Sequence, residues 1–142
     1  SKPNYTPEKV RDRCVRSHEK VFLFSKKPRY FFDGEAIRIP ANSGDTKLRP
    51  DVWTIPTSSY KGAHFATFPP ELVEPCVLAG SPWGGVVLDP FGGSGTTAGV
   101  ALAHGRKAII CELNESYASL IPERVESIKS KIYENSLTEL GL

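Results

Sequence analysis

Two short segments in the second half of the chain consist mainly of hydrophobic residues, at positions 86–88 and 107–111. Runs of this length, rich in Val and Ile, are typical of strands buried inside a sheet. Residues 94–103 between them predict a helix, because Gly105 lies just past the end of the segment and glycine commonly ends helices. The order strand–helix–strand predicts a parallel pair with a right-handed crossover. A ligand is then expected at the carboxyl ends of the strands.

Two further helices are predicted on either side of this unit. The first spans residues 70–79, since proline is tolerated in a first turn and Gly80 is a typical end signal, although Pro75 favours a kink. The second follows Asn114, a favourable N-cap residue, and Pro122 divides it into a short turn and a longer helix. Its apolar residues recur at helical spacing, namely Tyr117, Leu120, Ile121, Val125, Ile128 and Ile132.

The first half of the chain has weaker patterns. Residues 8–18 predict a helix, and residues 20–24 form an apolar, aromatic run that predicts a strand. Residues 30–32 and 52–55 predict short extended segments. Residues 33–50 contain Gly, Pro, Asn, Ser and Asp, so they predict a loop.

The composition is that of a globular protein, with 39% hydrophobic and 24% charged residues, and 142 residues correspond to one domain or part of one. No apolar run approaches the ~20 residues that span a bilayer, and no segment resembles a signal peptide. The three cysteines, Cys14, Cys76 and Cys111, are odd in number and lack metal-ligand spacing. They favour free thiols, no metal and a reducing compartment, so we expect a cytoplasmic location without a membrane partner.

Charge is divided unevenly along the chain. Residues 1–61 carry 13 Lys and Arg against 7 Asp and Glu, a net charge of +6, whereas residues 62–142 carry 5 against 9, a net charge of −4. The first half could therefore face a polyanion such as nucleic acid. A charge of +6 is modest for a dedicated DNA-binding protein, so ordinary surface chemistry explains it equally well.

The most informative motif is residues 89–97, Asp-Pro-Phe-Gly-Gly-Ser-Gly-Thr-Thr, between the first strand and its helix. Glycines remove side chains where a backbone bends and approaches a ligand, and a helix N-terminus presents unpaired N–H groups. Asp89 is placed to meet a cationic group. The motif lacks the lysine of a phosphate-binding P-loop, although Gly93-x-Gly95-x-x-Ala98 fits a permissive dinucleotide fingerprint. A tight turn without a ligand is the alternative.

Glu112 ends the second strand, seventeen residues after Gly95. A carboxylate at this position can accept hydrogen bonds from two ribose hydroxyls together. The alternative is a solvated charge at the end of a strand. Because Asp89 and Glu112 end neighbouring strands, the ligand interpretation of each supports that of the other.

These motifs resemble those of the DNA amino-methyltransferases that use S-adenosylmethionine and methylate N6 of adenine or N4 of cytosine. Residues 89–97 look like the family motif D-P-F-x-G-S-G-T-T. Residues 61–72 resemble the preceding cofactor motif with its H-F-A-x-F-P core, and Glu112 lies in the pattern E-x-N-x-x-Y. Residues 18–33 resemble the strand and hairpin region, and residues 52–56 the lead-in to the cofactor motif. The motif order is that of the β group.

The resemblance implies an α/β fold, an incomplete Rossmann-like methyltransferase sheet with a parallel βαβ core and hairpin strands. It implies that S-adenosylmethionine is the cofactor. Asp89 and the glycine turn would hold its methionine end and Glu112 its ribose. The cofactor-binding residues implied are His64, Phe65, Ala66, Thr67, Phe68, Asp89, Phe91, Gly92, Gly93, Ser94, Gly95, Thr96, Thr97 and Glu112. His64 also fits a structural histidine, and Phe65 and Phe68 fit core positions.

Double-stranded DNA is the expected substrate. Lys26, Lys27 and Arg29 would contact phosphates, and Tyr30 would line a pocket for a flipped base. A solvated turn explains the same three cations equally well. Direct attack by the amino nitrogen of the base would form no covalent enzyme intermediate, so no cysteine is required.

Catalysis in this family depends on a tetrapeptide [DNS]-P-P-[YFW], which does not occur in these 142 residues. We therefore expect no catalytic residue in this chain, which would be the inactive C-terminal part of a bacterial or phage restriction–modification methyltransferase that lacks its N-terminal half. Within one partial domain, residues 1–33 would be the hairpin region, 34–60 a shortened DNA-recognition segment and 61–142 the cofactor-binding region.

An incomplete sheet leaves an unpaired edge and exposed apolar surface, so we also expect a homodimer or another association. Two functional alternatives remain open. One is a remnant that binds S-adenosylmethionine or DNA without catalysis, and the other is a fragment of an NAD-binding oxidoreductase.

Overall fold

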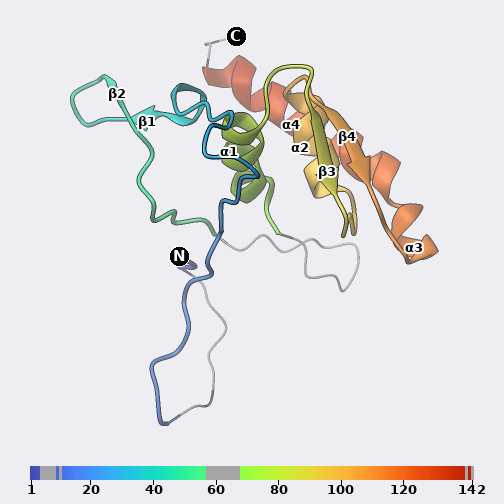
Figure 1. The fold of residues 1–142 in the computed structure, drawn as a ribbon, viewed down its shortest axis with the longest axis horizontal. Coiled ribbons are helices and arrows are strands. Elements are labelled where there is room, and N and C mark those ends of the chain that lie inside the picture. Colours follow the sequence, from blue (N-terminus) through green and yellow to red (C-terminus); the bar gives the residue numbers. More distant parts are fainter. Residues whose placement is uncertain (4–8, 10, 57–67, 140, 142) are drawn as a thin grey trace.

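Two parallel strands and the helix that joins them form the centre of the computed structural model, which describes residues 1–3, 9, 11–56, 68–139 and 141 (Figure 1). Strand β3 spans Val86–Asp89 and strand β4 spans Lys107–Ile110, and they pair from Val86 opposite Lys107 to Asp89 opposite Ile110. Helix α2, Thr96–Ala103, connects them. The predicted strand–helix–strand unit and its parallel pairing are confirmed, with α2 starting two residues later than expected.

The remaining elements precede and follow this unit in the chain. None of the helices in the described part of the chain is long and apolar enough to cross a membrane. In chain order, the other elements are the 3-10 helix η1 (Glu35–Ile37), β1 (Ile39–Pro40), β2 (Thr46–Lys47), α1 (Pro70–Gly80), α3 (Glu115–Ala118) and α4 (Ile121–Glu139).

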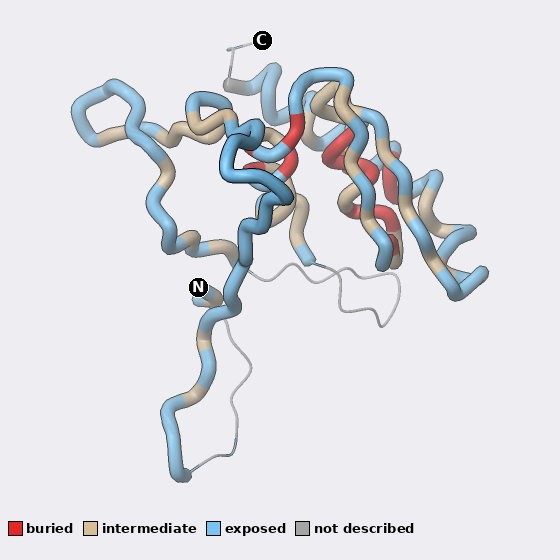
Figure 2. The backbone as a smooth tube through the Cα atoms, in the orientation of Figure 1, coloured by how far each residue is buried: buried red, intermediate tan, exposed pale blue. Residues whose placement is uncertain are grey.

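Helix α2 is the element around which the others pack, because it contacts α1, α4 and both strands of the parallel pair. The core consists of Val77 from α1, Val100 and Ala101 from α2, and Ile128 from α4. Figure 2 shows that the buried residues gather on these three helices behind the strands. The position of α2 therefore depends on apolar contacts along much of its surface.

Small residues let α2 approach α4 closely. A Cβ atom added at Gly99 would lie 2.9 Å from Cβ of Ile128, well inside van der Waals contact. Because the obstructing atom is next to the backbone of α4, a change of side-chain rotamer cannot relieve the clash. The glycine at this position therefore sets the distance between the two helices.

Polar contacts tie α1 to the C-terminal end of α2. His104 Nε2 lies 2.7 Å from Glu74 Oε1, and Arg106 Nη2 donates to the carbonyl oxygen of Ser81 at 2.8 Å. These contacts lie at the end of α2 that is opposite its glycine turn. They hold the helix in place without occupying the carboxyl ends of the strands.

The parallel pair is covered on one face only within the described structure. Val87 and Ala108 pack against the core, whereas Val86, Leu88 and Ile109 are between 55 and 62% exposed on the other face. Parallel sheets are normally buried on both faces, and their strands are apolar for that reason. The open face is thus an exposed apolar surface in the described structure.

The predicted helix ends agree closely with the structure. Pro70 starts α1, which continues past Pro75 to Gly80, one residue beyond the expected end. Asn114 caps α3, because its side chain accepts a hydrogen bond from the N–H of Ser116 at 3.0 Å. The chain breaks between α3 and α4 just before Pro122, as expected.

Several predictions for the first half of the chain are wrong. Residues 11–18 form no helix, and the rest of that prediction lies outside the described residues except for residue 9. Residues 20–24, 30–32 and 52–55 form no strand pairs in the described structure. A strand needs a partner for its backbone hydrogen bonds. The N–H of Ile55 donates to the carbonyl oxygen of Ser1 at 3.1 Å, but no strand ladder forms at any of these segments within the described residues. The hairpin strands expected near residue 20 are therefore absent there.

A short hairpin occurs instead within the predicted loop at residues 33–50. Strands β1 and β2 pair antiparallel, and Arg38 ties them by donating from Nη2 to the carbonyl oxygen of Thr46 at 2.8 Å. The pairing is only two residues long, so hydrophobic periodicity could not identify it.

We predict that Gly99→Ala lowers the free energy of unfolding by about 1–3 kcal/mol, because overpacking against Ile128 outweighs the higher helix propensity of alanine. Urea denaturation followed by circular dichroism measures this change. Gly80→Ala is the matched control, since a Cβ there meets nothing within 4 Å. Equal stabilities of the two variants would contradict the proposed role of Gly99 in helix packing.

Candidate functional site

The glycine turn begins where β3 ends and runs directly against the end of β4. The N–H of Gly92 donates to the carbonyl oxygen of Cys111 at 2.8 Å, which extends the pairing of the strands into the turn. A Cβ atom at Gly92 would lie 3.0 Å from Cβ of Ile110 and 3.4 Å from the oxygen of Cys111. The close approach leaves little room for a side chain at this position.

Gly95 ends the turn and is the N-cap residue of α2. Its φ of +86° lies in the left-handed region, which favours glycine. A Cβ there would also lie 3.0 Å from Cγ2 of Ile121, at the start of α4. The N–H groups of the first turn of α2 have no acceptor inside the helix and face the carboxyl ends of the strands.

Asp89 is held by two donors from the residues that follow it. Its Oδ1 accepts from the N–H of Phe91 at 2.9 Å, and its Oδ2 accepts from the hydroxyl of Thr97 at 2.6 Å. The carboxylate therefore links the end of β3 to the first turn of α2. Both bonds involve the charged acceptor, which makes them stronger than neutral hydrogen bonds.

Glu112 is held in the same way at the other side of the turn. Its Oε2 accepts from the N–H of Gly93 at 2.8 Å, and its Oε1 accepts from the N–H of Asn114 at 2.8 Å. The predicted proximity of Asp89 and Glu112 is thus found in the structure, because both carboxylates bind the same glycine turn.

This arrangement leaves acceptor capacity on both acids. A carboxylate offers about four lone-pair sites, and two on each acid are occupied by the chain itself. Glu112 can therefore still accept from two neighbouring hydroxyls, and Asp89 can still accept from an ammonium group. A ligand with a vicinal diol and a cationic end, at the carboxyl ends of the strands, fits these two acids.

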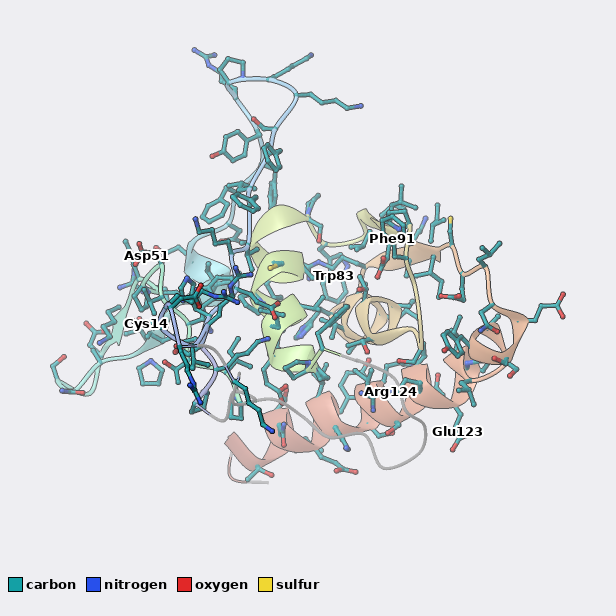
Figure 3. All side chains as sticks on the ribbon, turned by 90° about the horizontal axis from the view of Figure 1, so that it is seen from below. Cys14, Asp51, Trp83, Phe91, Glu123 and Arg124 are labelled. Atoms are coloured by element: carbon teal, nitrogen blue, oxygen red, sulfur yellow. The ribbon has the colours of Figure 1, made fainter. Side chains whose placement is uncertain are left out.

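The other predicted cofactor residues are placed differently. Phe91 is 87% exposed at the outer side of the turn (Figure 3), whereas the side chain of Thr96 is buried in the core. Phe68 is exposed directly before α1. His64, Phe65, Ala66 and Thr67 lie outside the described residues.

The predicted DNA-binding residues lie on a separate exposed segment. Lys26, Lys27, Arg29 and Tyr30 are all exposed. Figure 3 shows the pale-blue segment that contains them as a loop standing away from the helices. Its base is fixed, because the N–H of Asp33 donates to the carbonyl oxygen of Ala79 at 2.9 Å. The loop is free to meet a partner that approaches from outside.

Cys14, Cys76 and Cys111 are free thiols. Desolvation in α1 raises the pKa of the Cys76 thiol, although part of the residue remains exposed. Its Sγ also donates to the carbonyl oxygen of Leu72 at 3.5 Å. A thiol with a raised pKa stays protonated near neutral pH and is a poor nucleophile.

Two residues next to the turn, Asn114 and Ile121, were not identified as site residues from the sequence. Asn114 was expected to cap a helix, but its own N–H also holds Glu112. Ile121 was expected to pack in a helical core. It also packs against Gly95, because a Cβ atom added at Gly95 would lie 3.0 Å from Cγ2 of Ile121. The pattern Glu112-x-Asn114 indicated a role for Asn114, whereas nothing in the sequence indicated the contact between Ile121 and Gly95.

Comparisons with known proteins agree with this geometry. A family model described as DNA methylase, for N6 and N4 methyltransferases, matches residues 1–123. The chain is 53% identical to the Type II methyltransferase M.SmaI of Serratia marcescens and 45% identical to the Type II methyltransferase M.XycI of Xanthomonas campestris pv. cyanopsidis. These matches cover 88% and 93% of this chain, respectively. Among solved structures, the M1.HpyAVI–SAM complex is 28% identical with a TM-score of 0.51, over 70% of this chain and 46% of that chain.

The chain is much shorter than these relatives. It spans 44% of the length of each of the two Type II methyltransferases. The shared region includes the parallel pair, α2 and the two acids, because the family model covers residues 1–123. The comparison therefore concerns the part of the molecule that forms the candidate site.

We predict that Glu112→Ala frees the N–H groups of Gly93 and Asn114, which would then exchange with solvent about 10- to 100-fold faster, the effect of losing a hydrogen bond to a charged acceptor. Hydrogen–deuterium exchange followed by NMR measures both amides. Glu126→Ala, which removes an exposed carboxylate paired with Lys129 on α4, is the control. Unchanged exchange at Gly93 would show that Glu112 does not hold the turn.

Proposed function

The chain belongs to the DNA methylase family of N6 and N4 amino-methyltransferases, and from that premise we propose that it is the cofactor-binding portion of such an enzyme. The cofactor proposed is S-adenosylmethionine, which is named in the complex of the structural neighbour. The observation that carries the proposal is the glycine turn held between Asp89 and Glu112.

The residues at the turn fit the groups of this cofactor. Glu112 would accept from the two hydroxyls of the ribose with its remaining lone pairs. Asp89 would face the cationic amino group of the methionine end. When bound, S-adenosylmethionine supplies an electrophilic methyl group, and the role of this chain is to bind and orient it.

The cofactor residues implied by the family motif remain part of the proposal. Backbone N–H groups of the turn would approach the cofactor most closely where glycine leaves room. We propose that the cofactor-binding residues are His64, Phe65, Ala66, Thr67, Phe68, Asp89, Phe91, Gly92, Gly93, Ser94, Gly95, Thr96, Thr97 and Glu112.

DNA is the proposed substrate, contacted by the exposed loop at residues 26–30. Lys26, Lys27 and Arg29 would bind phosphates and Tyr30 a flipped base. The net charge of +6 over residues 1–61 supports this orientation of the basic half toward DNA. Whether the amino group is N6 of adenine or N4 of cytosine is left open by the family itself.

We propose that this chain does not transfer methyl groups by itself. The tetrapeptide [DNS]-P-P-[YFW] does not occur in the sequence, and the curated relatives are more than twice as long. A complementary portion that carries the tetrapeptide would supply the catalytic groups. The open face of β3 and β4 supports this view, since Val86, Leu88 and Ile109 lie uncovered there.

Association would cover the open face. We expect the complementary portion of the enzyme to bind there, and the alternative is a second copy of this chain in a homodimer. The proposal places the complex in the bacterial cytoplasm, where its DNA would be found. A remnant that binds cofactor or DNA without catalysis is the second candidate function, and it is favoured by the same missing tetrapeptide.

We predict that isothermal titration calorimetry detects binding of S-adenosylhomocysteine, a stable analogue of the cofactor, to this chain and detects no binding of NAD. Asp89→Ala should weaken binding of the analogue by about tenfold or more, because the ammonium group loses its counter-charge. Glu126→Ala, distant in sequence and exposed on α4, should bind as the unaltered chain does. Binding of NAD alone would support the oxidoreductase alternative and end the methyltransferase interpretation of the site.

We predict that the chain alone transfers no tritium from labelled S-adenosylmethionine to DNA. Mixing it with the portion of the Serratia marcescens relative that lies outside the matched region should produce transfer, because that portion is the proposed source of the catalytic groups. The mixture should also bind less of a dye specific for exposed apolar surface. Transfer by the chain alone would disprove the claim of inactivity, and binding of the analogue without any transfer would favour the remnant.

A further inference from the structure

Thr97 supplies the side-chain donor among the four hydrogen bonds that hold the two acids of the glycine turn. The other three donors are the backbone N–H groups of Phe91, Gly93 and Asn114. Backbone donors persist in every variant of a residue except proline, whereas a hydroxyl is removed by one substitution. A substitution at Thr97 can therefore remove a hydrogen bond that orients Asp89.

The geometry of this bond defines what Thr97 can do for a ligand. Its hydroxyl carries one proton, and that proton is donated to Asp89 Oδ2 over 2.6 Å. The same hydroxyl cannot at the same time donate to a carboxylate of a ligand. A donor contact from Thr97 to the carboxylate of the methionine end would require the bond to Asp89 to break.

The bond also decides the direction of the carboxylate. Asp89 ends β3 and Thr97 is the second residue of α2, so the hydrogen bond spans the turn. With Oδ1 held by the N–H of Phe91 and Oδ2 by Thr97, the carboxyl plane is fixed from both sides. A carboxylate that is already oriented loses less conformational entropy when a cation binds to it.

We propose that Thr97 is a positioning residue, which strengthens the binding of a cationic ligand group by orienting Asp89 and makes no donor contact with the ligand itself. The inference rests on the proposed function, because it assigns the ammonium group of the cofactor to Asp89. It adds that the effect of Thr97 depends on two features, the charged group of the ligand and the carboxylate of Asp89.

Calorimetry with two adenosyl compounds tests the first dependence. S-adenosylhomocysteine carries the ammonium group, and 5′-methylthioadenosine has the same adenosine without the amino acid. Thr97→Val should weaken binding of the first about 3- to 10-fold, because an unrestrained Asp89 loses more conformational entropy when it binds the ammonium group, and should change binding of the second less than twofold. Thr97→Ser keeps the hydroxyl and should restore binding of S-adenosylhomocysteine to within about twofold of the unaltered chain. An equal loss for both compounds would show a general structural role and overturn the proposal.

A double-mutant cycle tests the second dependence. Asp89→Ala should reduce the affinity for S-adenosylhomocysteine to that for 5′-methylthioadenosine, and adding Thr97→Val should change it less than twofold further. A further loss of fivefold or more in the Asp89→Ala background would show that Thr97 contacts the ligand directly. Thr138→Val is the matched control, because its hydroxyl only donates to the carbonyl oxygen of Glu134 within α4.

A measurement without ligand separates this inference from the proposed function. In Thr97→Val, the loosened Asp89 should protect the N–H of Phe91 less, and NMR should show severalfold faster amide exchange there but not in Thr97→Ser. Unchanged exchange at Phe91 would overturn the inference whatever the chain binds. Failure of the unaltered chain to bind either adenosyl compound would instead count against the proposed function.

Discussion

The hydrogen bonds between two carboxylates and one glycine turn are the constraint on which the rest of this site depends. Glu112 holds the middle of the turn through the N–H of Gly93, and Asp89 holds its end through the hydroxyl of Thr97. Each acid also accepts from a backbone N–H close to it in sequence. These bonds therefore link the turn, β3, β4 and α2, and each acid keeps lone pairs that a ligand could use.

That unit is in turn placed by the packing of α2. Gly99 permits a close approach of α2 to α4, and Gly95 leaves room for Ile121 at the start of the same helix. Both glycines thus connect the position of the turn to α4, which lies after both strands in the chain. The opposite face of the sheet has no comparable cover in the described structure, since Val86, Leu88 and Ile109 are exposed. The glycine turn lies at the carboxyl ends of these two strands, apart from this exposed face.

The second half of the chain was predicted well because its signals are local. Continuous apolar runs gave the positions of both strands, and Pro70, Asn114 and Pro122 marked helix boundaries correctly. The first half was predicted poorly for a physical reason. Residues 20–24 have the composition of a strand, but strand formation requires hydrogen bonds to a second segment that no local pattern supplies.

The sequence by itself determined that Asp89 ends one strand and that Glu112 closely follows its parallel neighbour beside a glycine-rich turn, because alternation of strand and helix leaves few possible topologies. Only the tertiary structure decided how each acid is used. Whether Thr97 reaches Asp89 depends on the distance between the first turn of α2 and the end of β3, and the packing of α2 on both strands and on α4 sets that distance. Such distances arise from the sum of contacts in the core, which motif spacing along a chain does not encode.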